Sequence, residues 1–247
     1  MLYRKKLDSF SDLKILTGII SLFLTLFFDG KFFNYYLNNS QSISNIIMII
    51  TFIYIFSCCE REQKYIMIAM ILVTIPIEYL CSVHWKIYSY RLFNLPLYVP
   101  VGHSIVYITA FNISKDNLFN KYLTKRIIIF EIVIIFLAVF WLICDNDIFG
   151  FICCFVFIYI LKATPRNKIF LCALFITVSY LEFTGTLMQN WEWQATLQDQ
   201  AWDILPRGNP PFGVAIVYYV FDLICFSIYG GYIGFTQRQK ELSGRLS

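Results

Sequence analysis

Residues 127–144 read IIIFEIVIIFLAVFWLIC, an apolar run with one ionisable side chain, Glu131. An α-helix needs about 20 mostly apolar residues to cross the hydrocarbon layer of a membrane. The whole chain has the same character, since 58% of its 247 residues are hydrophobic and only 15% are charged. So little polar surface cannot cover a water-facing globule, and this composition argues against nucleic-acid binding and disorder. We therefore expect an all-α, polytopic membrane helix bundle.

Seven further apolar runs lie on either side of this one, which gives eight expected transmembrane helices. In chain order the eight runs are 15–28, 43–59, 65–83, 95–113, 127–144, 148–161, 169–188 and 212–235. The first and sixth are short, and they need flanking aromatic residues or the stems of Lys14 and Lys162 to complete a crossing. Most of the eight cysteines lie inside these runs, where we expect them to act as small apolar residues.

The distribution of basic residues predicts the orientation of the spans. Lys and Arg accumulate in the cytoplasmic loops of membrane proteins. With the N-terminus inside, 16 of the 20 Lys and Arg fall on the cytoplasmic side. The basic start Arg4-Lys5-Lys6 precedes an apolar run without a small-residue cleavage site, as an uncleaved anchor does. We expect an integral protein of a prokaryotic inner membrane with both termini in the cytoplasm.

Two similar loops predict an internal repeat. Trp85 and Gly102 are 17 positions apart, as are Trp191 and Gly208, and each glycine lies in a Pro-x-Gly tract. An offset of 106 residues carries expected spans two to four onto six to eight, so we expect two parallel four-helix repeats, 1–114 and 115–247, in one membrane domain. The alternative is that the two loops are independent turns, with Pro and Gly as ordinary helix breakers.

Four ionisable side chains inside the expected spans form the candidate catalytic group: Glu78, Glu182, His103 and Asp222. A charge within a membrane is costly, so each such residue is a functional hypothesis. A carboxyl group in an apolar cavity is a competent proton donor, and aromatic faces stabilise a developing cation. The expected substrate-binding residues are aromatic or polar neighbours: Trp85, Tyr88, Tyr90, Trp191, Trp193, Trp202, Asn209, Tyr218 and Tyr219.

Other roles for these groups remain open. The polar side chains could hold the two loops by hydrogen bonds while the aromatic residues form an interfacial belt, or they could line a transport or ligand-carrying path. Two histidines are too few for a histidine-rich zinc site, and we expect no metal and no cofactor. Glu131 lies next to Lys125 and Arg126 on the cytoplasmic side, is expected to snorkel or to be ion-paired there, and is left out of the site. The expected partners are membrane lipid and an apolar small molecule, and the oligomeric state is left open.

The tract with Glu78, Tyr88, Tyr90, Pro96 and Pro100 distantly resembles the membrane carotenoid hydratases. Their motif has a glutamate, a glycine-rich stretch, a Tyr-x-Tyr and then a Val-Pro turn, and the glycines are absent here. The resemblance implies a polyprenyl-like substrate whose terminal double bond is protonated by an acidic side chain. Over its whole length the chain looks more like prokaryotic integral membrane proteins of unknown function that carry a Gly-Asn-Pro-Pro tract, here residues 208–211.

Overall fold

The structure of the protein is a computed structural model that describes residues 2–37, 39–197 and 204–244, with the backbone alone for residues 2–12, 166 and 232–244. It is all-helical, with 78% of the chain in helices and nearly no sheet, which confirms that the protein is all-α. The α-helices are α1 (Leu2–Asp29), α2 (Lys31–Asn34), α3 (Ser40–Ser57), α4 (Arg61–Glu78), α5 (Tyr98–Lys115), α6 (Asn117–Asp145), α7 (Ile148–Ala163), α8 (Lys168–Leu187) and α9 (Ala215–Gly244).

Each of the eight expected spans coincides largely with one long helix, and α2 is a short extra turn. In the described part of the chain, four helical segments are long and apolar enough to cross a membrane. They are Ser40–Ser57, Arg61–His84, Asn117–Asp145 and Lys168–Leu187. The structure is therefore that of an apolar helix bundle compatible with a membrane.

Local sequence explains where several helices begin and change form. The backbone N–H of Glu60 donates to the side chain of Gln63 at 3.0 Å in a capping box at the start of α4. Asp116 caps α6 by accepting from the backbone N–H of Phe119 at 2.7 Å. Directly after Glu78, the chain of α4 widens into a π-helix, η1 (Tyr79–His84). A second irregular turn, the 3₁₀-helix η2 (Pro165–Asn167), connects α7 and α8.

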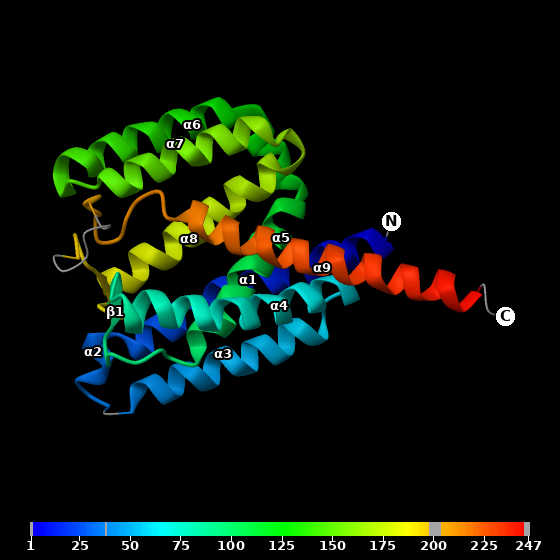
Figure 1. Ribbon diagram of the computed structural model, residues 1–247, viewed down its shortest axis with the longest axis horizontal. Coiled ribbons are helices and arrows are strands. Elements are labelled where there is room, and N and C mark those ends of the chain that lie inside the picture. Colours follow the sequence, from blue (N-terminus) through cyan, green and yellow to red (C-terminus); the bar gives the residue numbers. More distant parts are fainter. Residues whose placement is uncertain (1, 38, 198–203, 245–247) are drawn as a thin grey trace.

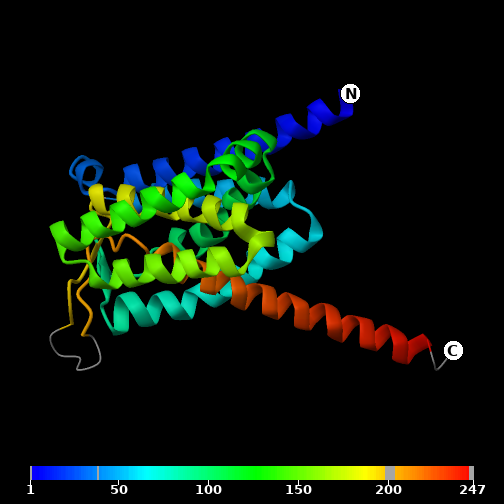
Figure 2. The same cartoon turned by 90° about the horizontal axis from the view of Figure 1, so that it is seen from above.

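The ends of the described chain lie at the same end of the molecule, and a short β-ribbon lies at the other (Figures 1 and 2). The ribbon consists of β1 (Tyr88–Tyr90) and β2 (Trp191–Trp193), which pair in antiparallel fashion. In its register Tyr88 lies opposite Trp193 and Tyr90 opposite Trp191. The ribbon therefore ties a loop of the first half of the chain to a loop of the second.

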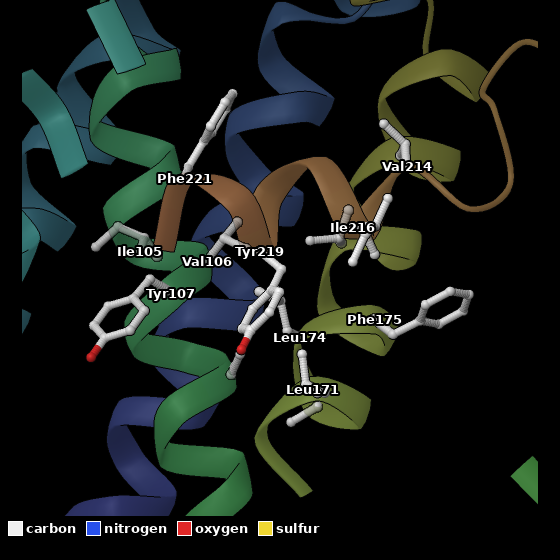
Figure 3. Close-up of a cluster of buried hydrophobic side chains, with 14 of the residues drawn as sticks. Ile105, Val106, Tyr107, Leu171, Leu174, Phe175, Val214, Ile216, Tyr219 and Phe221 are labelled. Carbon is white, nitrogen blue, oxygen red and sulfur yellow. The ribbon is translucent and has the colours of Figure 1, made fainter. Parts of the chain in front are cut away.

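Helix α5 is at the centre of the bundle and is buried along most of its length. Figure 3 shows apolar side chains of α5, α8 and α9 packed together. The labelled ones are Ile105, Val106 and Tyr107 of α5, Leu171, Leu174 and Phe175 of α8, and Val214, Ile216, Tyr219 and Phe221 in or just before α9. Because α5 also packs on α8 and α4 on α9, the two expected units 1–114 and 115–247 share one core. Their division at residue 114 stays a prediction.

Candidate functional site

A cavity of about 190 Å³ lies beneath the β-ribbon, between α1, α4, α5, α8 and α9. Most of its lining is apolar, but Glu78, Glu182 and His103 also line it, with only 4%, 4% and 6% of their surfaces exposed. The cavity brings together eight of the predicted site residues: Glu78, Tyr88, Tyr90, His103, Glu182, Trp191, Trp193 and Tyr218. Buried carboxylates in an apolar cavity need hydrogen-bond donors, and each has a full set.

Glu78, the last residue of α4, receives three donors. The hydroxyls of Tyr88 and Tyr90 both donate to its Oε2, each at 2.7 Å. His103 Nε2, from α5, lies 2.9 Å from its Oε1. Residues two apart on a strand point to the same face, which explains why Tyr88 and Tyr90 reach one oxygen together. The π-helix that follows Glu78 belongs to a type of distortion that is frequent at functional sites.

The two tyrosines of β1 act as donors and not as acids. Burial, and then the Glu78 carboxylate beside them, raise the pKa of Tyr88 and of Tyr90 well above the ordinary value for tyrosine. Both phenols therefore keep their protons throughout the physiological pH range and hold Oε2 of Glu78 in place.

Glu182 of α8 is held in a similar way by the second strand. The indole N–H groups of Trp191 and Trp193 donate to its Oε2 at 3.0 and 3.2 Å, and the hydroxyl of Tyr218, on α9, donates to its Oε1 at 2.8 Å. An indole N–H can only donate, so Oε2 must be an acceptor. Oε1 is consequently the oxygen of Glu182 that can carry a proton.

Aromatic contacts join the two carboxylate networks into one site. The ring of His103 stacks on that of Tyr218, with centroids 4.7 Å apart and planes 18° apart. Across the ribbon, Tyr88 lies against Trp193 at 4.6 Å and Tyr90 against Trp191 at 6.1 Å. The donors of Glu78 are therefore in ring contact with the donors of Glu182. A shift of one carboxylate changes the contacts of both sets of donors.

Four of the described predicted site residues lie away from the cavity lining: Trp85, Tyr219, Asp222 and Asn209. Trp85 is 40% exposed, and Tyr219 packs in the apolar core between α5 and α8 (Figure 3). Asp222 is buried one helical turn beyond Tyr218, and within the described part of the chain its Oδ2 has no hydrogen-bond partner. Asp222 does not bond to Tyr218, because the Tyr218 hydroxyl donates to Glu182 instead.

Asn209 supports the site from outside. Its side-chain oxygen accepts from the backbone N–H of Trp193 at 3.1 Å, so it positions β2 and does not touch a carboxylate. Tyr218, and not Asn209, gives Glu182 the bond that corresponds to the one between His103 and Glu78. Trp202 lies outside the described residues.

Two buried aspartates that the sequence analysis passed over fix the loops around the cavity. Asp29, at the end of α1, pairs with Arg91 at 2.6 Å and accepts from the hydroxyl of Tyr98 at 2.7 Å. Asp147, just before α7, accepts from the backbone N–H groups of Gly150, Gly208 and Phe212 at 2.9, 2.9 and 2.8 Å. Each lies at the edge of an apolar run, Asp29 directly after 15–28 and Asp147 directly before 148–161, where a charged residue is ordinary, so no signal in the sequence singles them out.

Glu131 lies outside the site and is ion-paired, as expected. It pairs with Lys162 of α7 at 3.6 Å, because α7 folds back along α6. The neighbouring Arg126 lies over the ring of Tyr122 at 4.0 Å instead. Across the described residues, no group of three or more His, Cys, Asp or Glu side chains could hold a metal ion, and the eight cysteines are free thiols.

A close approach at Gly185 gives a stability test of the site. A Cβ at this position would collide with the indole of Trp191, so Gly185→Ala should displace the ring and weaken its bond to Glu182. We expect a loss of about 2 kcal/mol, typical of overpacking in a core. The same change at Gly230, where nothing lies within 4 Å, is the control and should be neutral or slightly stabilising. Thermal unfolding of both variants in a neutral detergent checks this, and equal unfolding temperatures would contradict it.

No protein-family model, curated protein or solved structure matches this chain. The geometry of the cavity and its two carboxylates is therefore what indicates a function for this protein.

Proposed function

We propose that the protein is an integral membrane enzyme that transfers a proton to an apolar lipid substrate, of isoprenoid type, in the cavity beneath the β-ribbon. The observation that carries this proposal is the pair of buried, fully hydrogen-bonded carboxylates, Glu78 and Glu182, in one mostly apolar cavity with aromatic walls. A purely structural role would require only one acceptor for each loop. It gives no reason for both acceptors to border an apolar space large enough for part of a ligand.

The charges around the cavity favour Glu182 as the acid. Among the described lining residues, His103 is the one side chain that can carry a positive charge, since neither Lys nor Arg is present. At most one of the two carboxylates is therefore balanced by the protein. His103 lies 2.9 Å from Glu78, so the unbalanced carboxylate is Glu182, and a proton on its Oε1 neutralises it at rest.

The proposed step is protonation of a carbon–carbon double bond. The π electron pair of the substrate takes the proton from Oε1 of Glu182, and the O–H bonding pair stays on the carboxylate. Positive charge develops on the substrate carbon, beside the rings of Trp193 and Tyr218. The Glu78 carboxylate of the Glu78–His103 pair then accepts a proton from a neighbouring carbon, which completes an isomerisation or a cyclisation. Proton exchange with water afterwards removes this proton from Glu78 and returns one to Glu182. With water as a second reactant, the same pair accepts the proton of the attacking water, and the product is an alcohol.

We further propose that all eight long helices cross the membrane as two parallel four-helix repeats, with both termini in the cytoplasm of a prokaryotic cell. The matched contacts of the site support the repeat. Glu78 takes donors from Tyr88 and Tyr90 as Glu182 takes them from Trp191 and Trp193, and the two strands pair with each other. An axis between the paired strands would exchange Tyr88 with Trp191. The match of Trp85 with Trp191 in the sequence is therefore a few residues out of step with this match in the structure.

Comparison of the lipids of a deletion strain with those of its parent tests the proposed function. We expect one apolar lipid to accumulate and its product to disappear, with recovery on complementation by the wild-type protein or by Glu131→Gln, the control. Glu182→Gln should not restore the product. A carrier predicts unchanged lipid structures in the deletion strain, and a scaffold predicts full complementation by Glu182→Gln. Either result would overturn the enzyme proposal.

A further inference from the structure

We propose that the cavity binds a single organic cation carried on an apolar body, with Glu182 as its counter-ion. This inference deepens the proposed function, on which it rests for the identity of the cation as a charge developed on the substrate. The binding preference itself follows from the cavity alone.

The charge of the cavity is the first reason. With two carboxylates and one histidine in its described lining, the site holds at least one unbalanced negative charge whenever Glu182 has given up its proton. A charge buried among apolar groups is costly unless it is paired. A ligand with one positive charge restores neutrality, and a neutral ligand of the same shape does not.

The walls of the cavity are the second reason. Five aromatic rings line it near the carboxylates, those of Tyr88, Tyr90, Trp191, Trp193 and Tyr218. Aromatic cages of this kind bind quaternary ammonium groups through the negative faces of the rings. The remaining lining includes Leu22, Leu26, Ile77, Val99, Val217 and Phe221, which suits a hydrocarbon chain.

The hydrogen bonds show why an organic cation fits better than a metal ion. Hard metal ions need bare oxygen ligands in direct contact. All four carboxylate oxygens of Glu78 and Glu182 already contact donors from the protein. A diffuse organic cation needs no such direct ligand, since it is attracted by the charge and by the ring faces.

An unpartnered hydroxyl is a separate sign that the cavity is built for a ligand. Thr25 of α1 lines the cavity and is 1% exposed, yet its Oγ1 has no hydrogen-bond partner among the residues that the structure describes. A buried hydroxyl without a partner is destabilising. A polar atom on the ligand, next to its cationic centre, would satisfy it.

The test compares two ligands that differ in charge alone. One carries a trimethylammonium head on a geranyl chain, and the other carries a tert-butyl head on the same chain. Binding to the full-length protein in a maltoside detergent is followed by the fluorescence of the cavity tryptophans, Trp191 and Trp193. We expect the ammonium ligand to bind at least about tenfold more tightly. Equal affinities for the wild-type protein would overturn the proposal, and this comparison needs no variant.

Variants then locate the counter-ion. Glu182→Gln should bind the ammonium ligand and the tert-butyl ligand with about equal affinity. Glu131→Gln, which does not line the cavity, should keep the full preference for the ammonium ligand. A preference that survives in a folded Glu182→Gln protein would overturn the assignment to Glu182. The two proposals can fail separately. Preferential ammonium binding without a lipid change in the deletion strain would support the cation site and contradict the enzyme. A lipid change without preferential ammonium binding would support the enzyme and contradict the cation site.

Discussion

Glu182→Gln is expected to slow the proposed reaction by about 100-fold to 10,000-fold, the usual cost of removing a general acid. The variant should still fold. The amide oxygen can accept from the indoles of Trp191 and Trp193, as Oε2 does, and the amide nitrogen can donate to the hydroxyl oxygen of Tyr218. The hydrogen bonds of the site thus survive while the proton is lost. Conversion of the lipid found in the deletion strain, measured with purified protein, gives the rate.

Glu78→Gln and Glu131→Gln make this result specific. Glu78 contacts His103 and serves as the proton acceptor in our scheme, so its replacement should also slow the reaction, and it should alter the dependence of the rate on pH. Glu131, paired with Lys162 far from the cavity lining, should be neutral. Wild-type rates for a folded Glu182→Gln protein would contradict the assignment of the acid.

Asp147→Ala is expected to destabilise the protein by at least about 3 kcal/mol, because it leaves three buried backbone N–H groups without an acceptor. This is a large share of the total stability of a folded domain. The affected bonds tie Gly208 and Phe212, which lead into α9, to the start of α7. Thermal unfolding in a neutral detergent measures the loss.

Asp145→Ala is the matched control for that substitution. Asp145 lies two residues away and accepts one bond, from the backbone N–H of Asn209, in an exposed position. Its removal should cost less than about 1 kcal/mol, since water replaces the lost acceptor. Equal losses for the two variants would show that the buried cluster around Asp147 does not hold the loop.

The helices of this protein could be predicted from sequence because apolar runs bounded by charges and breakers leave few alternatives. All eight expected runs lie on long helices, from the run at 15–28 to the one at 212–235. Their capacity to cross a membrane is clear for four, since the others are shorter, less apolar or only partly described. The β-ribbon could not be predicted, because three-residue strands carry little pattern and their partners lie about a hundred positions apart.

Part of the candidate site followed from one rule, that ionisable groups within spans face the interior. That rule found Glu78, Glu182 and His103, which line one cavity. The rule could not decide whether Asp222 belongs to the site. The depth of Asp222 in its span does not show that the Tyr218 hydroxyl donates to Glu182 instead. Asp29 and Asp147 were not predicted, because both lie at the edges of apolar runs, where a charged side chain costs little free energy and is common.

The β-ribbon has a consequence for biosynthesis. Both carboxylates depend on donors from strands that pair with each other, and β2 leaves the ribosome only after α6, α7 and α8 have been made. Until then Tyr88 and Tyr90 have no partner strand, and Trp191 and Trp193 have yet to be made. The hydrogen bonds around both carboxylates can therefore be completed only after the second strand has docked on the first, so the cavity takes its final form late in the synthesis of the chain.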